Sequence, residues 1–169
     1  MKYYLAYGSN LNRAQMAVRC PDAVPAAAAT IPNHRLLFRR GFLTIEPYQG
    51  MEVPVVAWKI SDQDERNLDR YEGFPRFYRK KFFPIMLNGY RDMDAYRTGQ
   101  KAVEEKIAEA MVYIMNDGFP AQQPTRTYLE TVRNGYNDFG MDLTPLMNAL
   151  VDTYDEERLE ARAKEGGDQ

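Results

Sequence analysis

Two short stretches contain the residues best suited to chemistry. The first is Tyr7-Gly8-Ser9-Asn10-Leu11-Asn12 and the second is Leu68-Asp69-Arg70-Tyr71-Glu72-Gly73. The first is typical of a strand that runs into a tight loop and a helix N-terminus, which leaves backbone N–H groups free to bind an anion or a developing oxyanion. The second places a carboxylate at a helix C-terminus, where the helix dipole disfavours negative charge. Together they offer the two parts that acid–base acyl chemistry needs.

Glu72 is the candidate acid–base group. Helix spacing puts it on one face with Leu68 and Asp69, and the apolar Leu68 predicts that this face points inward. Apolar surroundings, the Asp69 carboxylate and the dipole end would each raise the pKa of Glu72 and make it a better base near neutral pH. The alternative is a solvated helix-end residue held by Arg70 or Arg76, since most charged residues lie at the surface.

The Gly8-Ser9-Asn10 turn is the candidate anion-binding loop. Gly8 permits positive φ and Asn10 tolerates it better than most residues, so the amides that follow can converge on one oxygen. An ordinary strand-to-helix turn explains the same residues equally well. The motif is not G-x-S-x-G, so Ser9 is a poor candidate for a nucleophile, and it is neither a P-loop nor a dinucleotide fingerprint.

Composition excludes several other kinds of site. Cys20 is the only cysteine and His34 the only histidine. An intrachain disulfide and a Cys-rich zinc site are therefore excluded, and a His-based metal site or a Ser-His-Asp triad would rest on one residue. We interpret Cys20 as structural or merely exposed, and His34 as a surface or hydrogen-bonded residue.

Length, charge and hydropathy set the broad class. A chain of 169 residues with 44% hydrophobic content suits one compact domain. The net charge of −2 and the absence of a basic stripe argue against nucleic acid as a partner. No apolar run reaches membrane-spanning length, and the apolar start is too short for a signal peptide. We therefore expect a soluble cytoplasmic protein that engages no membrane.

The elements that must position the two stretches are predicted from periodicity and turn residues. In the first half the predicted strands are 3–7, a long or broken strand over 24–29 and 35–38 that is interrupted near Pro32, and a strand pair over 42–46 and 53–60 joined across 47–50. The predicted helices are 13–19, capped by Asn12 with Gln15, and 62–72, capped by Ser61 with Asp64 and ended by Gly73.

In the second half, strands are predicted over 78–87 and 111–115, with a turn at Asn88-Gly89 between them and a polar excursion over 90–102. Residues 104–110 fit a helix or an extended segment. Thr125 caps a helix to about Phe139, and Gly140 ends it. A last helix starts at Thr144-Pro145 and has one apolar face, formed by Leu146, Met147, Leu150, Val151 and Tyr154. Strands that precede helices favour an α+β sheet or barrel over alternating βαβ units.

Taken in order, these motifs resemble the γ-glutamylcyclotransferase / AIG2-like family. The resemblance covers roughly residues 1–140, in the segments Tyr7–Leu11, Val55–Ile60, Leu68–Gly73 followed by Tyr78, Met111–Met115 and Pro124–Leu129. It implies an α+β fold, a small mixed β-barrel with helices packed around it. We expect a γ-glutamylcyclotransferase-like domain over 1–142, with 143–169 as a C-terminal helical extension and tail of the same domain.

The resemblance also implies a reaction. The α-amine of a γ-glutamyl group attacks its own γ-amide carbonyl, which closes 5-oxoproline and releases an amine or amino acid. Glu72 falls on the family's catalytic glutamate, and the implied substrate-binding residues are Tyr7, Gly8, Ser9, Asn10, Leu11, Asn12, Tyr78 and Tyr128. No cofactor and no metal is implied, and the partner is a small-molecule γ-glutamyl substrate. The alternative is a non-catalytic small-molecule binding or interaction module on the same fold.

Two segments depart from the family pattern. Residues 88–110 are longer than a simple hairpin, and the helix from Pro145 extends past the resembling region. Either could reshape the pocket or form a homodimer contact. The choice of substrate therefore stays open at this point.

Overall fold

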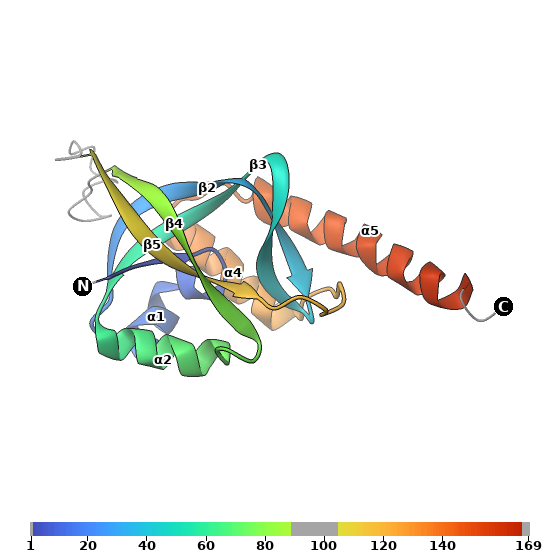
Figure 1. The fold of residues 1–169 in the computed structure, drawn as a ribbon, viewed down its shortest axis with the longest axis horizontal. Helices are drawn as coiled ribbons and strands as arrows, with labels where there is room; N and C mark the ends of the chain where they lie inside the picture. The colour runs from blue at the N-terminus through green and yellow to red at the C-terminus, as the bar shows by residue number, and fades with distance from the viewer. Residues whose placement is uncertain (1, 89–104, 167–169) are drawn as a thin grey trace.

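The computed structural model describes residues 2–88 and 105–166. Its centre is a five-stranded mixed sheet in the order β2-β3-β1-β5-β4 (Figure 1). The strands are β1 (Lys2–Ala6), β2 (Val24–Arg39), β3 (Phe42–Ile60), β4 (Tyr78–Asn88) and β5 (Glu105–Met115). Neighbouring strands are antiparallel except β1 and β5, which are parallel.

Helices pack around this sheet, most of them below and behind it in the view of Figure 1. They are the 3₁₀ turn η1 (Ser9–Leu11) and the α-helices α1 (Arg13–Arg19), α2 (Asp62–Glu72), α4 (Arg126–Asp138) and α5 (Thr144–Gly166). Strands thus dominate the first part of the chain and helices the last, so the α+β prediction is confirmed.

The two edge strands, β2 and β4, approach each other without pairing. The imidazole of His34 on β2 packs edge-on against the ring of Phe83 on β4, with centroids 5.3 Å apart. Within the described residues no hydrogen-bonded ladder joins these strands, so the sheet is open. The fold class expected from the resemblance is confirmed, with a barrel-like sheet that hydrogen bonding does not close.

The predicted strand pair over 42–46 and 53–60 is wrong. Both segments belong to the single strand β3, which pairs with the continuous strand β2 along its length. The hairpin turns instead at Arg40-Gly41, where both residues have positive φ. Residues 47–50 look like a turn in the sequence because a proline and a glycine punctuate them. In the structure they form a bulge opposite Asn33, where strands tolerate both residue types.

The helix signals around α1 and α2 are confirmed. The Asn12 side chain accepts a hydrogen bond from the Gln15 N–H at 3.0 Å. Ser61 and Asp64 form a complete capping box, and Gly73 ends α2 in the left-handed conformation. Glu72 is therefore the last residue of α2, as predicted.

The second half of the chain agrees with the prediction in outline. The ambiguous segment before Met111 is extended and belongs to β5, and residues 89–104 of the predicted excursion lie outside the described residues. Thr125 caps α4, with its side chain accepting from the Tyr128 N–H, and Gly140 has a positive φ just beyond the helix.

Helix α5 packs on β2 and projects beyond the sheet toward the C-terminus (Figure 1). The Phe38 N–H donates to the buried Thr153 hydroxyl at 2.9 Å. The apolar face predicted for this helix is only partly covered. Its inward members are Leu146 and Leu150, whereas its exposed members are Met147, Val151 and Tyr154. The apolar face of α5 is therefore wider than the part of it that packs on β2.

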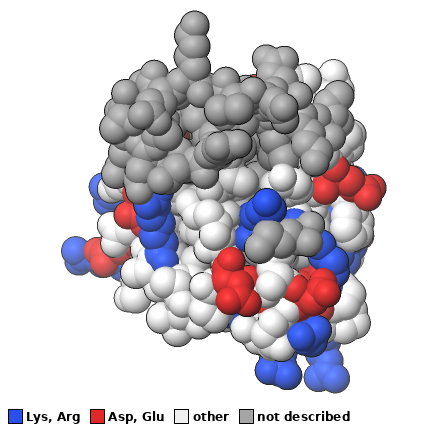
Figure 2. Space-filling view, turned by 90° about the vertical axis from the view of Figure 1, so that its left-hand side faces the viewer, with Lys and Arg blue, Asp and Glu red and all other residues white. Residues whose placement is uncertain are grey.

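The surface shows no segregation of charge on the face drawn in Figure 2, where basic and acidic side chains lie beside one another over the described residues. Among those residues, no helix is both long and apolar enough to cross a membrane.

Candidate active site

The two stretches singled out in the sequence meet in space. The chain leaves β1 at Ala6 and enters η1, and α2 ends at Glu72 beside it. The Asn10 side-chain amide donates to Glu72 Oε1 at 2.8 Å across 62 residues of sequence. This hydrogen bond joins the loop after β1 to the C-terminal end of α2 in one site.

Glu72 has an unusual environment for a carboxylate. Burial raises its pKa to about 7, although the hydrogen bond from Asn10 and the charge of Arg19 act in the opposite direction. The predicted direction is thus confirmed. Of the causes predicted, burial is the largest, whereas the Asp69 carboxylate is engaged by Lys80 and Tyr113.

The alternative partners Arg70 and Arg76 form no ion pair with Glu72 in the described structure. Its hydrogen-bond partner there is Asn10. The carboxylate is therefore held by a neutral amide rather than neutralised by a bound cation, which leaves its proton exchangeable at neutral pH.

Arg19 orients Asn10. Its guanidinium donates to Asn10 Oδ1 at 2.6 Å and to the Tyr71 hydroxyl at 2.6 Å, and it stacks 3.6 Å from the centroid of the Tyr71 ring. Since the Asn10 oxygen is engaged in this way, its NH₂ group must face Glu72 and the Tyr4 hydroxyl, which lies 2.8 Å away. The amide orientation is thus set by two further side chains.

Some backbone N–H groups of the loop already donate hydrogen bonds within the chain, and others do not. The Leu11 N–H donates to the Gly8 carbonyl at 3.0 Å and the Asn12 N–H to the Ser9 carbonyl at 3.1 Å. The N–H groups of Ser9 and Asn10 donate to no acceptor in the described part of the chain. Gly8 does not use positive φ, which was the freedom invoked from the sequence; its φ is −119°. Its lack of a side chain instead leaves room beneath the Tyr128 hydroxyl, which would lie 3.4 Å from a Cβ.

These groups surround a small inner cavity of about 30 Å³. Its lining consists of the loop, Glu72, Leu43 and a set of tyrosines, namely Tyr4, Tyr7, Tyr78, Tyr113 and Tyr128. The Tyr7 hydroxyl donates to the Tyr113 carbonyl at 2.7 Å and the Tyr78 hydroxyl to the Leu43 carbonyl at 3.2 Å. Burial raises the pKa of Tyr7, Tyr78 and Tyr128, so these hydroxyls stay neutral.

A wider outer chamber of about 360 Å³ adjoins the inner cavity and shares Ser9, Glu72, Tyr78 and Tyr128 with it. Its remaining lining is mostly aromatic. It comes from the β2–β3 turn and the start of β3, from the end of α2 and the segment after it, and from the end of β5 and the segment after it, namely Arg40, Phe42, Tyr71, Phe77, Met115 and Phe119. A ligand could therefore place a polar end inside and an apolar end outside.

Most of the predicted site residues are brought together. Those that line the inner cavity are Tyr7, Gly8, Ser9, Asn10, Glu72, Tyr78 and Tyr128. Leu11 is fully buried in the core and Asn12 caps α1, so neither lines either cavity.

Sequence reasoning missed several lining residues. Tyr4 and Tyr113 carry a hydroxyl within otherwise apolar strands, which is a signal that could have found them. Arg40, Phe42 and Phe119 have no comparable signal. They reach the outer chamber only because the β2–β3 turn and the segment after β5 lie side by side, where the Arg40 N–H donates to the Pro120 carbonyl at 3.1 Å.

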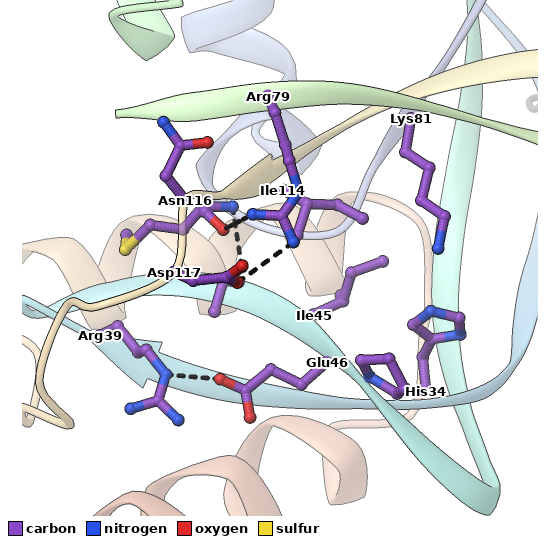
Figure 3. A pocket seen from close by; sticks show the side chains of 12 residues that line it. His34, Arg39, Ile45, Glu46, Arg79, Lys81, Ile114, Asn116 and Asp117 are labelled. Atoms are coloured by element: carbon purple, nitrogen blue, oxygen red, sulfur yellow. Dashed lines mark hydrogen bonds and ion pairs between the residues drawn. The ribbon is translucent and has the colours of Figure 1, made fainter. Parts of the chain in front are cut away.

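A second cavity of about 240 Å³ lies between β2–β3 and β4–β5 (Figure 3). Its arginines are paired: Arg39 binds Glu46 at 2.5 Å and Arg79 binds Asp117 at 3.3 Å. None of the predicted catalytic or substrate-binding residues lines it. The candidate chemistry therefore belongs to the cavity around Glu72.

Of the alternatives left open by the sequence, the structure favours a hydrogen-bonded His34 and a structural Cys20, because both residues are buried rather than exposed. His34 is buried, and its Nδ1 is 2.8 Å from the Pro32 carbonyl. Burial raises the pKa of the Cys20 thiol to about 12, so it carries little thiolate at neutral pH. Within the described ranges, no group of three or more His, Cys, Asp or Glu side chains could hold a metal ion.

Comparisons with known proteins agree with this fold. A family model described as "Gamma-glutamyl cyclotransferase, AIG2-like" matches residues 4–135. Among curated proteins no match was found. A solved structure named gamma-glutamyl cyclotransferase is 23% identical with a TM-score of 0.67, covering 84% of this chain and 82% of that chain. An uncharacterized human protein gives the same values.

A mouse AIG2-like protein is 15% identical with a TM-score of 0.52, covering 76% of this chain and 82% of that chain. At these identities the structural likeness shows the fold alone. The match to the family model, in contrast, extends over most of the chain and includes both stretches that form the site.

Proposed function

The chain belongs to the gamma-glutamyl cyclotransferase, AIG2-like family, and we propose that it is a γ-glutamylcyclotransferase. It cyclises a γ-glutamyl amino acid or amine to 5-oxoproline and releases the amine. One observation carries the proposal above the others: Glu72 is a half-buried carboxyl whose pKa is raised by burial to about 7, and it is held by the Asn10 amide beside the Gly8-Ser9-Asn10 loop.

Glu72 has the acidity that the reaction requires. The α-amine of a γ-glutamyl group is mostly protonated at neutral pH and must lose a proton before it can attack. A carboxyl with a pKa near 7 is present in both forms at that pH, so it can accept this proton and later donate it. An exposed glutamate with an ordinary pKa is a weaker base, so it would remove the proton from the α-amine less efficiently.

The loop supplies the complementary electrostatics. When the α-nitrogen bonds to the γ-carbon, the carbonyl oxygen becomes an oxyanion. The N–H groups of Ser9 and Asn10, which have no acceptor among the described residues, are available to stabilise it or to bind the substrate α-carboxylate. The neutral Tyr78 and Tyr128 hydroxyls complete a polar wall around the same space.

The atoms balance without water. The new C–N bond closes the five-membered ring and the old γ-amide C–N bond breaks. The α-ammonium loses two protons on the way to the lactam N–H: Glu72 passes one of them to the leaving nitrogen as its bond breaks, and the other ends on the released amine, which leaves as an ammonium. Nucleophile and electrophile belong to one molecule, so the small inner cavity contributes by selecting the folded rotamer of the glutamyl chain.

The test is release of 5-oxoproline from a panel of γ-glutamyl dipeptides, glutathione and γ-glutamylamines, with the wild type and Glu72→Gln side by side. We expect turnover by the wild type and a loss of about 10²- to 10⁴-fold in kcat for Glu72→Gln, because the amide cannot take or return the proton. Glu65→Gln, on the same helix, is the matched control and should retain turnover.

Three other outcomes would change the assignment. Equal release by the wild type and Glu72→Gln would move the base elsewhere. Release by neither protein, with tight binding of a panel member, would favour a non-catalytic binding module on the same fold. Release by neither and no binding would contradict the γ-glutamyl assignment.

A further inference from the structure

Arg40 stands at the entrance to the outer chamber in a fixed backbone setting. It is the first residue of the β2–β3 turn, with φ of 51°, and its N–H donates to the Pro120 carbonyl at 3.1 Å. Its side chain lines the chamber together with Phe77 and Phe119. The turn therefore aims a cation at the space into which the outer end of a bound ligand would extend.

The guanidinium is held by rings rather than by carboxylates. It lies 5.2 Å from the centroid of Phe77 and 5.1 Å from that of Phe119. Cation–π contacts of this kind hold the group in place while leaving its N–H donors free. Within the described residues, no carboxylate lies in ion-pair range of Arg40 and no acceptor binds its side chain.

Neighbouring arginines are engaged differently. Arg39, one residue earlier, binds Glu46 at 2.5 Å and Glu156 at 3.1 Å. Arg19, at the end of α1, donates to Asn10 and Tyr71. Arg40 thus differs from both in that its guanidinium remains available to an anion from outside the chain.

We propose that Arg40 determines leaving-group specificity by binding a carboxylate on the group that leaves. This inference rests on the proposed function and narrows it: the substrates are γ-glutamyl amino acids or peptides rather than γ-glutamyl amines. Arginine binds carboxylates through two parallel N–H···O bonds, a geometry that a simple amine leaving group cannot use.

The remaining walls of the chamber indicate the character of the leaving side chain. Phe42 is 49% exposed and Phe77 is 41% exposed, so both present ring surface that a ligand can cover. Two charged residues, Glu72 and Arg40, belong to the described lining of the outer chamber. An apolar or aromatic amino acid fits this combination, and a leaving group with a second ammonium is repelled by Arg40.

The experiment compares γ-glutamyl-phenylalanine with γ-glutamyl-phenethylamine, which has the same ring but lacks the leaving-group carboxylate. For the wild type we expect kcat/KM to be about 10-fold or more higher for the dipeptide, the size of a charge-assisted hydrogen bond. Arg40→Met should reduce this ratio to within about twofold, chiefly through a higher KM for the dipeptide, and Arg40→Lys should restore part of it.

The matched control is Arg66→Met. It removes the same charge from an exposed position on α2 whose side chain binds Gln63 and lines neither cavity. The ratio should stay at the wild-type value in this variant. A ratio near 1 in the wild type, or an unchanged ratio in Arg40→Met, overturns the inference while cyclisation itself stands.

Failure of the proposed function is recognised separately. If neither compound yields 5-oxoproline with the wild type, the cyclase proposal fails. Calorimetric binding of the two compounds then still tests Arg40: tighter binding of the dipeptide that is lost in Arg40→Met supports the carboxylate subsite, and equal binding overturns it.

Discussion

Glu65 and Glu72 lie two turns apart on α2, yet their surroundings push the two carboxyl pKa values in opposite directions. At Glu65, burial alone would raise the pKa, but hydrogen bonds from Lys2 and Lys80 outweigh it and lower the pKa. At Glu72, burial prevails and raises the pKa to about 7. The first region is an ion-pair cluster of Lys2, Glu65, Asp69 and Lys80, and the second is the Glu72 pocket.

The difference comes from the elements that pack beside the helix. Lys80 on β4 lies between two turns of α2 and binds Glu65 at 2.6 Å and Asp69 at 2.7 Å. One turn further along, Asn10 from η1 offers Glu72 a neutral donor instead. The middle of α2 thus forms stabilising ion pairs, and its end provides the candidate acid–base group. Lys80 causes the difference, because it binds Glu65 and Asp69 but not Glu72.

The largest effect on stability is expected from removing that lysine. In Lys80→Met, Glu65 and Asp69 stay close together in a region that is only partly solvated, and lose their shared cation. We expect a loss of about 2–3 kcal/mol in the free energy of unfolding, less than for a fully buried pair because the side chains keep some exposure. Urea denaturation measures it.

The control for this variant is Lys59→Met, at an exposed position on β3, which should change stability by less than about 0.5 kcal/mol. If Lys80→Met and Lys59→Met were equally stable, the ion-pair cluster would not stabilise the fold. The distinction between a stabilising ion-pair cluster and the Glu72 pocket would then be wrong.

The second prediction is that the two glutamates differ in the sign of their effect on stability. Glu72 has a folded pKa above its unfolded value, so the folded state binds the extra proton between about pH 4.5 and 7 and loses stability as the pH rises through that window. At pH 8, Glu72→Gln should therefore stabilise the protein by on the order of 1–2 kcal/mol, and the gain should vanish below about pH 4.5.

Glu65→Gln should behave in the opposite way. Its folded pKa is lowered, so its stabilising effect is present above the unfolded pKa and is lost as the pH falls through the folded value. We expect this variant to be destabilised by about 1 kcal/mol at pH 7 and to approach the wild type in acid. Thermal unfolding of both variants across pH 3–8 decides whether the signs differ.

The smallest effect concerns the pH profile of the proposed reaction. The acidic limb of kcat/KM should report the pKa of Glu72, about 7, with activity falling tenfold per pH unit below it. The Asn10 hydrogen bond lowers this pKa. In Asn10→Ala the limb should therefore move to higher pH, whatever happens to the absolute rate. A limb that moved to lower pH would contradict the role given to Asn10.

Local signals in the sequence were sufficient for several features of the site. The capping box at Ser61 and Asp64 and the left-handed Gly73 determine both ends of α2, so the position of Glu72 at the helix end was predictable. The same holds for the Asn12 cap of α1. Helix caps involve neighbours within about four residues, which is the range over which sequence spacing specifies contacts.

The hairpin was harder because two turn signals competed. Arg40-Gly41 and residues 47–50 both contain turn residues, and the chain turns at the first and bulges at the second. The choice depends on which register buries the apolar residues of β2 and β3 together, and that register is a property of the assembled sheet. The location of Arg40 at the outer chamber followed from the same choice.

By itself the sequence determined the helices with their caps, most of the strands, the family and the two stretches that form the site, because periodicity, caps and motifs act over short distances along the chain. Only the tertiary structure decided which carboxylate of α2 has the properties of a base. Asp69 and Glu72 are three residues apart, but Lys80 and Tyr113 reach the first and Asn10 reaches the second. A carboxyl pKa is set by desolvation and by charges that arrive through space, and neither is encoded in local spacing.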